Sequence, residues 1–507
     1  MLVYFSGNCD CAGRLIEPTL YGLKTMPAPT TDRRAEAPLL YEQVAAQIVR
    51  LIDNGTWRPG DRIPSVRMLS RQQSVSVATV LQAYRLLENR GRIEARPQSG
   101  YFVCARAWTP PAEPGVSRPA KGATQVNVGE LAMRVMKATH NPALIRLGAA
   151  LPSPELLPTQ QLNRCLAAVG RSSGSAGSDY SVPPGNLALR TQIAQRALEA
   201  GCTLSPDEIV ITCGALEALN LCLRAVARTG DTIAIDSPCY FGILQCIEAM
   251  GLKALEIPTH PRDGVSLEAL AYALETQPIR ACLFVLNYNN PLGSCMPDAN
   301  KKRLVEMLAE RAIPLIDDDI YGDLAFGPTR PRTAKSYDRN GLVLLCDSFS
   351  KTLAPGYRVG WCAPGRWQEQ VEHLKLVTTV ATATLPQMAI ADFLANGGYN
   401  HHLRRIRRLY AEKVQLVSEA VTRFFPAGTR ITRPTGGYVL WVEMPPAVNS
   451  LELFDRALAA GISIVPGPVF SAKGKFRNFI RLNCGNPWSE HIERAIEKLG
   501  RMARQLT

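Results

Sequence analysis

Near its start the sequence carries apolar residues at the spacing of an amphipathic α-helix. A first helix is expected over residues 40–54, before Gly55, and its apolar face consists of Leu40, Val44, Ile48 and Ile52. A second helix is expected after Pro64, with Ser65 as its N-cap, because a serine hydroxyl can accept a bond from the free N–H groups of a first turn. These segments predict a small helical unit.

A third helix and two strands complete this unit. The third helix is expected from Ser76 to Gly91, and its apolar stripe consists of Val80, Ala83, Tyr84 and Leu87. The next residues, RIEARPQSGYFV, alternate between polar and apolar side chains around a turn at Ser99 and Gly100, which predicts a hairpin. Helix, turn, helix and hairpin in this order indicate a winged helix-turn-helix domain.

The rest of the chain shows a different pattern, in which short apolar runs alternate with amphipathic helical stretches. The clearest runs are residues 209–212, 232–235, 281–286, 313–316 and 343–346. Alternation of this kind predicts parallel strands joined by crossover helices, and therefore an α/β domain.

The chain of 507 residues is too long for one ordinary domain, and it divides into four segments. Residues 1–37 have no apolar period and are expected to be disordered, or to precede a start at Met26. Residues 38–106 form the winged unit. Residues 107–125 are rich in proline, alanine and glycine, which is typical of an extended linker. Residues 126–507 form the α/β domain.

Charge points to a polyanionic partner for the winged unit. The net charge of the chain is +13, and twelve arginines against six acidic residues between Arg33 and Arg106 give that segment an excess of six. A local basic excess favours DNA as the partner. The candidate DNA contacts are Arg62, Ser65, Arg67, Ser76, Thr79 and Arg96. The small polar residues at the start of the third helix suit the major groove, and the arginines suit phosphates or guanine edges.

Composition excludes several other classes. The 14 cysteines lack zinc-site spacing, with Cys9 and Cys11 as the only close pair. The adjacent His401 and His402 would face different directions on a helix, so no metal site is expected. No run approaches the ~20 apolar residues that cross a bilayer, and the start does not resemble a secretory leader. We therefore expect a cytoplasmic protein with free thiols and no membrane partner.

Three phrases of the winged unit, PGDRIPSVRMLS, VSVATVLQAYRLLENRG and ARPQSGYFV, resemble the GntR family of bacterial regulators. The resemblance covers residues 38–106 and implies binding to double-stranded operator DNA. The alternative is a winged helix that serves only protein contacts.

The strongest chemical signal is the phrase SFSKTLAPGYRVGW, from Ser348 to Trp361. A lysine in this place can form a Schiff base with an aldehyde cofactor if its surroundings lower its pKa. Ser348 and Arg358 would bracket a phosphate, which arginine clamps with two parallel bonds. The phrase resembles the pyridoxal-phosphate (PLP) site of class I aminotransferases, called fold type I. The resemblance implies that Lys351 bonds the cofactor.

It also implies a mixed, mainly parallel sheet, a smaller C-terminal α+β subdomain, and further site residues. Asp318 fits the carboxylate that keeps the ring nitrogen protonated, with Asp319 as the alternative register. Tyr321 and Asn290 resemble residues that bond the phenolic oxygen of the ring, and Asn290 is also assigned to the substrate. Tyr240 resembles the aromatic residue that stacks on the ring. The resemblance implies that three of these residues, Lys351, Asp318 and Tyr321, are catalytic.

Three more features concern phosphate, substrate and assembly. Gly214, Ala215 and Leu216 start a helix after a strand, where backbone N–H groups can cradle the phosphate. The family often has a hydroxyl residue where Ala215 stands, so one side-chain contact is lost. Arg481 in FIRLN resembles the arginine that clamps the α-carboxylate of an amino acid. Tyr180 resembles a tyrosine that reaches the phosphate of the neighbouring subunit, which implies a homodimer.

Winged helix, linker and aminotransferase domain in this order resemble the MocR-type subfamily of GntR regulators, from about residue 38 to the end. The resemblance implies a transcription regulator whose PLP domain senses an amino acid or amine effector. One alternative is a working aminotransferase with an accessory DNA-binding domain, because no catalytic position is missing. Another is a PLP carrier or dimer platform, which leaves Arg481 without a role.

Overall fold

In the computed structural model, the described residues are 39–53, 56–89, 92–104, 110–396 and 398–507. The chain divides into two compact units, residues 1–108 and residues 109–507. The predictions for residues 1–37, including the pair Cys9 and Cys11, and for helix stops at Gly55 and Gly91 lie outside the described residues.

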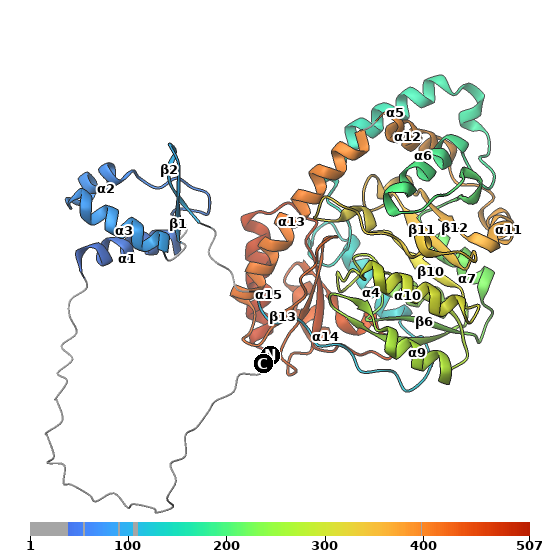
Figure 1. Cartoon of the computed structure of the whole chain (residues 1–507). Helices are drawn as coiled ribbons and strands as arrows, with labels where there is room; N and C mark the ends of the chain where they lie inside the picture. Colours follow the sequence, from blue (N-terminus) through green and yellow to red (C-terminus); the bar gives the residue numbers. More distant parts are fainter. Residues whose placement is uncertain (1–38, 54–55, 90–91, 105–109, 397) are drawn as a thin grey trace, which may run out of the picture. The chain divides into compact units, whose positions relative to one another are not determined.

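The described part of the first unit contains three helices and a hairpin (Figure 1). Its elements are α1 (Leu40–Asp53), α2 (Val66–Gln73), α3 (Val77–Asn89), β1 (Ile93–Arg96) and β2 (Gly100–Val103). The apolar stripe predicted for α3 is buried and packs with Val44 and Ile48 of α1 and Leu69 of α2 in one core. The predicted winged helix-turn-helix fold is confirmed.

Local bonds fix the turn between α2 and α3. Ser65 caps α2 and accepts a hydrogen bond from the N–H of Met68 (3.3 Å). Ser74 adopts a left-handed conformation with φ of 52°, which ends α2. The hydroxyl of Tyr84 donates to the carbonyl of Pro64 (2.6 Å). This bond ties α3 to the residues that precede α2, so the two helices keep a fixed relation.

A nine-stranded sheet forms the centre of the second unit. Its strand order is β3-β7-β6-β9-β10-β11-β12-β5, with β8 paired to β7. The strands are β3 (Thr124–Gln125), β5 (Val210–Thr212), β6 (Thr232–Ser237), β7 (Lys253–His260), β8 (Gly264–Val265), β9 (Ile279–Phe284), β10 (Leu315–Asp318), β11 (Val343–Ser348) and β12 (Gly360–Ala363). Five neighbouring strands, β7, β6, β9, β10 and β11, are parallel. β12 runs antiparallel to both of its neighbours, β11 and β5.

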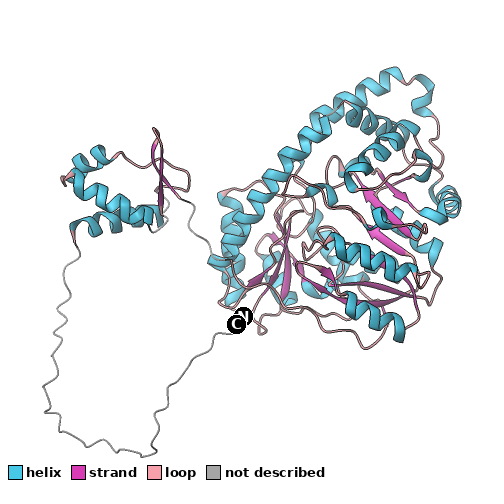
Figure 2. Cartoon of the chain, in the orientation of Figure 1, coloured by secondary structure: helices cyan, strands magenta, loops and turns pink. Residues whose placement is uncertain are grey.

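Helices cover both faces of this sheet (Figure 2). The helices of the unit are α4 (Gly129–His140), α5 (Thr159–Ser172), α6 (Leu187–Ala197), α7 (Ala215–Val226), α8 (Phe241–Ala249), α9 (Leu267–Thr276), α10 (Asp298–Ala309), α11 (Gln368–Thr379), α12 (Thr384–Ala395), α13 (Gly398–Phe424), α14 (Ser450–Ala459) and α15 (Glu490–Arg504). One core packs strand residues against α7, α8 and α11. A second core packs the alternate strand residues against α9 and α10.

A smaller antiparallel sheet lies in the C-terminal part of the chain. Its order is β13 (Arg430–Ile431), β14 (Val439–Glu443), β17 (Phe479–Asn483) and β16 (Val465–Pro466). The long helix α13 packs against α15 beside it (Figure 1). A parallel pair, β4 (Ile145–Arg146) with β15 (Ile462–Ser463), joins an early segment to this subdomain. The predicted mixed, mainly parallel sheet with a smaller α+β subdomain is confirmed.

The predicted apolar runs all fall on strands of the large sheet, with differences at their ends. The fourth run was predicted as residues 313–316, but β10 begins at Leu315 and continues to Asp318. Polar residues can extend a strand because the ladder uses backbone groups, and Asp318 pairs with Cys346. The antiparallel β12 was not predicted.

Residues 110–125 lie extended along the second unit. The carbonyl of Ala112 accepts from the N–H of Ile431 (3.1 Å), and the hydroxyl of Ser117 bonds that of Ser237 (3.1 Å). β3 then pairs with β7. The described part of the segment predicted as a linker therefore belongs to the second unit, where its backbone finds hydrogen-bond partners. None of the described helices is long and apolar enough to cross a bilayer.

Candidate functional site

A cavity of about 290 Å³ lies in the second unit at the carboxyl ends of the parallel strands. Four charged residues line it. Asp318 ends β10, Lys351 follows β11, Arg358 follows a short turn after that lysine, and Arg481 comes from the middle of β17. Ligand sites of open α/β sheets form at this edge, because loops from several strands converge there. Residues distant in sequence are thus brought into one site.

Lys351 is partly exposed and lines the cavity. Its Nζ donates to the carbonyl of Ala150 (2.9 Å) and lies 6.0 Å from the ring centre of Tyr321. Desolvation, followed by the positive charge of Arg481, lowers the pKa of Lys351 to about 8. A lysine with such a pKa is partly neutral near neutral pH, which an amine nucleophile requires.

Asp318 is 4% exposed and also lines the cavity. Burial raises the pKa of its carboxyl to about 7. Its Oδ1 has no hydrogen-bond partner among the described residues. A buried carboxylate oxygen without a partner is costly, so this atom calls for a cationic N–H donor from a ligand.

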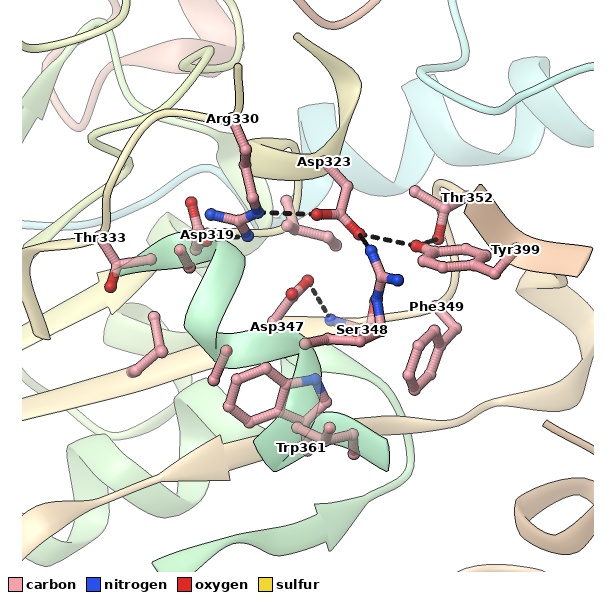
Figure 3. Close-up of a pocket in the computed structure, with 16 residues that line it drawn as sticks. Asp319, Asp323, Arg330, Thr333, Asp347, Ser348, Phe349, Thr352, Trp361 and Tyr399 are labelled. Atoms are coloured by element: carbon pink, nitrogen blue, oxygen red, sulfur yellow. Dashed lines mark hydrogen bonds and ion pairs between the residues drawn. The ribbon is translucent and has the colours of Figure 1, made fainter. Parts of the chain in front are cut away.

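Asp319, the alternative register, faces another environment (Figure 3). It accepts from Asn287 Nδ2 (2.7 Å) and from Arg330 Nη2 (2.5 Å), and it lines a separate cavity of about 40 Å³. Arg330 also bonds Asp323 (2.7 Å). Asp319 is therefore already paired, and of the two aspartates only Asp318 lines the cavity that contains Lys351.

The network in Figure 3 also holds the residue that follows Lys351. The hydroxyl of Tyr399 donates to Asp323 Oδ2 (2.8 Å) and bonds Thr352 Oγ1 (2.9 Å). The ring Nε2 of His402 bonds the carbonyl of Thr352 (2.7 Å). Thr352 is thus fixed from α13 by side chain and backbone, which restricts the position of the neighbouring lysine.

Arg481 is 1% exposed and has no carboxylate partner among the described residues. Its guanidinium donates to Asn290 Oδ1 (3.0 Å) and to the carbonyl of Gly148 (2.5 Å), while Nε has no acceptor. Asn290 Nδ2 in turn donates to the hydroxyl of Tyr321 (3.3 Å). A buried guanidinium without a counter-ion on a cavity wall calls for an anionic ligand, and a carboxylate matches its planar geometry.

The start of α7 also lines the cavity. Gly214 caps this helix with φ of 85°, and a side chain there would collide with the guanidinium of Arg358. Arg358 donates to the carbonyl of Cys213 (2.9 Å) and to Ser350 Oγ (3.3 Å). Ala215, Leu216 and Ser348 line the cavity beside them. The helix start, the arginine and the hydroxyls form a concave anion-binding site.

The two tyrosines predicted beside the ring and phosphate differ in position. Tyr240 lines the cavity at the start of α8. Tyr180 is 74% exposed and does not line the cavity. The structure therefore brings every predicted cofactor and substrate residue except Tyr180 to this cavity or its rim.

These features fit pyridoxal phosphate. The orphaned Oδ1 of Asp318 suits a protonated ring nitrogen, Lys351 suits an aldehyde, and the concave site at Gly214 and Arg358 suits a phosphate. The residues that would hold it are Asp318, Lys351, Tyr321, Asn290, Tyr240, Arg358, Ser348 and the N–H groups that start α7.

On the winged unit, the candidate DNA contacts lie at the start of α3 and nearby. The hydroxyls of Ser76 and Thr79 bond each other (2.8 Å), and Ser76 also accepts from the N–H of Thr79 (3.1 Å). The side chain of Arg67 is exposed and has no ion pair or hydrogen bond among the described residues. Arg62, also exposed, has its guanidinium against Gly100 of the hairpin. These groups are accessible to a polyanion.

Two other candidates on the winged unit already have partners. Ser65 is engaged as the cap of α2. Arg96 pairs with Glu94 (2.7 Å) and lies 4.4 Å from the ring centre of Phe102. Each must exchange or share an internal contact to reach DNA.

Sequence reasoning missed several residues of the large cavity. Ser350 lies within the phrase around Lys351 and could have been found as a second hydroxyl. Met136 and Thr139 of α4, with Ala149 and Leu151, line the cavity without any motif. Only the tertiary fold places them there, so no local signal identifies them.

Comparison with known proteins agrees with both units. Residues 40–103 match the family of bacterial regulatory proteins called gntR, and residues 152–499 match aminotransferase class I and II. The HTH-type transcriptional regulator YdcR of Escherichia coli is 41% identical over 92% of this chain and 99% of its own. A 2-aminoadipate transaminase of Thermus thermophilus is 31% identical over 76% of this chain and 96% of its own.

Solved structures resemble the second unit. The α-aminoadipate aminotransferase LysN of Thermus thermophilus, solved with N-(5'-phosphopyridoxyl)-L-leucine, has a TM-score of 0.68 and 29% identity over 75% of this chain and 99% of its own. An aminotransferase of Thermococcus profundus has a TM-score of 0.69 and 25% identity over 74% of this chain and 94% of its own. Because the GntR domain and the aminotransferase domain occur in one chain, and YdcR, a relative that spans both, is a regulator, this protein belongs to the MocR-type subfamily of GntR transcription regulators.

Proposed function

We propose that this regulator binds pyridoxal phosphate in the large cavity and changes its DNA binding when an amino acid or amine enters beside the cofactor. The observation that carries the proposal is the pair of buried, unpartnered groups Asp318 Oδ1 and Arg481 Nε in one cavity with a lysine of lowered pKa. Such groups are costly unless a ligand completes them. Because the same chain contains a winged helix, binding of that ligand can change how the protein binds DNA.

The cavity residues have distinct roles in this proposal. When bound, pyridoxal phosphate supplies an aldehyde that bonds an amine and a ring that withdraws electrons from the amino-acid Cα. Lys351 provides the amine through Nζ and can afterwards hold a proton there. Asp318 keeps a proton on the ring nitrogen, and Tyr321 orients the phenolic oxygen. Arg358 and the start of α7 bind the phosphate.

Arg481 binds the carboxylate of the effector. Its rigid fork of donors can donate to two carboxylate oxygens, and Asn290 already orients one of its nitrogens (3.0 Å). The α-carboxylate of an amino acid would lie at Arg481, and the amine on the same Cα would lie toward Lys351. This arrangement selects an amino acid over a simple amine.

We further propose a homodimer. Tyr180 is 74% exposed in one chain, so its side chain is free to contact a second copy, as expected for a tyrosine that reaches a neighbour's phosphate. Two copies present two winged units to two DNA half-sites. The effector controls DNA binding only if it favours one arrangement of the dimer over another. The described cysteines are all free thiols, which suits a cytoplasmic regulator.

Binding of the full chain to a duplex from its own upstream region tests the proposal. Affinity is measured at physiological salt for the cofactor-free protein, the PLP-loaded protein and the loaded protein with amino acids. We expect preference over random duplex and a change of at least about fivefold between states, within the usual range of allosteric coupling. Equal affinity for both duplexes overturns DNA recognition, and equal affinity in all states overturns sensing.

The second candidate function is amino-group transfer between an amino acid and a 2-oxo acid. The observation that favours it is that the groups for cofactor, proton and carboxylate all line one cavity. Steady-state turnover with an amino acid and a 2-oxo acid supports this activity. Cofactor absorbance that never changes with an amino donor counts against it. Slow turnover can coexist with regulation.

A further inference from the structure

A carboxylate contacts the backbone at the helix start that would bind the cofactor phosphate. Glu217 belongs to the first turn of α7, and its Oε2 accepts from the backbone N–H of Cys213 (2.6 Å). The carbonyl of Cys213 accepts from Arg358 (2.9 Å). The residue before Gly214 is therefore held by a carboxylate through its N–H and by the arginine of the anion-binding site through its carbonyl.

Two residues of α11 hold this carboxylate in place. Lys375 is 1% exposed, and its Nζ donates to Glu217 Oε2 (2.7 Å) and to Cys213 Sγ (3.7 Å). Thr379, one turn further along α11, donates to Glu217 Oε1 (2.8 Å). Both carboxylate oxygens are thus bonded from the same helix. A buried lysine and its acidic partner depend on each other, because either charge alone is costly there.

The charge of Glu217 has two opposite effects at this place. An acidic side chain in the first turn stabilises the start of a helix. A phosphate monoester, however, carries a charge of about −1.5 to −2 near neutral pH and would bind at the same helix start. Like charges repel each other, and the repulsion is screened less where water is excluded. Lys375 offsets the charge of Glu217 and leaves its hydrogen bond to Cys213 intact.

We propose that Lys375 is a positioning residue for the cofactor phosphate and acts through Glu217. It neutralises the carboxylate and fixes it on the N–H of Cys213, so the phosphate meets the first turn of α7 without an opposing charge beside it. Lys375 does not line the cavity, and it acts without touching the cofactor. This inference rests on the proposed function, because it assumes that the start of α7 binds the phosphate of PLP.

The test compares pyridoxal phosphate with pyridoxal, which has the same ring and aldehyde but no phosphate. Absorbance titration of the cofactor-free, full-length protein gives the affinity for each ligand, and the ratio of the two affinities measures the contribution of the phosphate. The titration is made above about pH 7, where a lone glutamate is ionised. We expect Lys375→Met to lower this ratio by at least about tenfold, because the unpaired carboxylate then repels the phosphate.

Glu217→Gln should change the ratio in the opposite direction. A glutamine oxygen can still accept from the N–H of Cys213, while Lys375 keeps its positive charge, so the ratio should stay or rise. The loss of a purely structural ion pair would instead weaken both ligands in both variants. The matched control is Lys301→Met on α10, whose lysine is also buried and pairs with Asp298 (3.2 Å). This control should leave the ratio unchanged.

The double variant Glu217→Gln/Lys375→Met carries neither charge, so its ratio should return to within about threefold of wild type. If Lys375→Met does not fold, Glu217→Gln and the double variant still decide: a ratio at least about tenfold below wild type in either one overturns the inference. A wild-type ratio in a folded Lys375→Met protein also overturns it, while PLP binding stands. Equal affinity of the wild-type protein for both ligands, or no PLP band at all, contradicts the proposed function itself.

Discussion

The cavity of the second unit and the exposed face of the winged unit use charge in opposite ways. Asp318 and Arg481, which line it, are 4% and 1% exposed, and each has one buried side-chain atom without a hydrogen-bond partner among the described residues. Arg62 and Arg67 of the winged unit are exposed to solvent. A buried charge without a partner costs several kcal/mol, whereas an exposed charge is hydrated and screened by salt. The cavity therefore specifies its ligand atom by atom, while the winged face specifies mainly a polyanion.

Substitution of the cavity lysine should have the largest effect. Lys351→Ala removes the lysine that lines the cavity, so we expect complete loss of the covalent cofactor link and of the visible absorbance it causes. The control is Lys302→Ala on α10, where the lysine side chain is 61% exposed. Equal absorbance in the two variants would show that the lysine at the cavity does not bond the cofactor.

The next largest effect concerns Arg481. We expect Arg481→Ala to retain the cofactor band but to weaken the response to amino acids by at least about 100-fold, because two charge-assisted bonds at about 1.5–3 kcal/mol each are lost. Arg481→Lys keeps the charge but not the fork, so its response should be intermediate. Spectral titration measures both variants. A wild-type titration curve in Arg481→Ala would mean that the carboxylate binds elsewhere.

A pH experiment probes the buried carboxylate. In the cofactor-free protein the pKa of Asp318 is raised to about 7, so the folded state keeps a proton that the unfolded state loses between about pH 4 and pH 7. The stability from that proton is full below the unfolded pKa and disappears as the pH rises through the folded pKa. Asp318→Asn should remove this loss.

The cofactor-free Asp318→Asn protein should therefore be more stable than wild type above about pH 7, by a few kcal/mol at about 1.4 kcal/mol per pKa unit. The difference should shrink toward about pH 4. Thermal unfolding of both proteins across this range measures it. If the stability of the two proteins differed by the same amount at every pH, burial would not raise the pKa of the Asp318 carboxyl.

The smallest effect is expected on the winged face. Arg67 is free of internal partners in the described part of the chain, whereas Arg96 already pairs with Glu94 (2.7 Å). Arg67→Ala should lower DNA affinity and reduce the salt dependence by about one phosphate contact, and Arg96→Ala should change both by less. Affinity measured against salt concentration compares them. A larger loss of DNA affinity for Arg96→Ala than for Arg67→Ala would show that Arg96, not Arg67, makes the stronger DNA contact.

The sequence predicted the two units unequally well. Lys351 and Arg358 could be located because they lie in one recognisable phrase after β11, and Asp318 because it ends the apolar run of β10. Parallel strands bring their carboxyl ends together, which places these residues in one site. The choice between Asp318 and Asp319 needed the structure, since Arg330, which pairs with Asp319, lies eleven residues further along. The place of Met136 in the lining of the cavity could not be predicted, because α4 reaches the cavity only through tertiary packing. On the winged unit, sequence could not show that Arg96 is already paired.

Borohydride reduction of the full-length, PLP-treated protein, followed by peptide mass mapping, tests the central claim most directly. The account predicts one reduced pyridoxyl group per chain, on the peptide that contains Lys351. An adduct confined to another lysine, or no adduct at all, would contradict it.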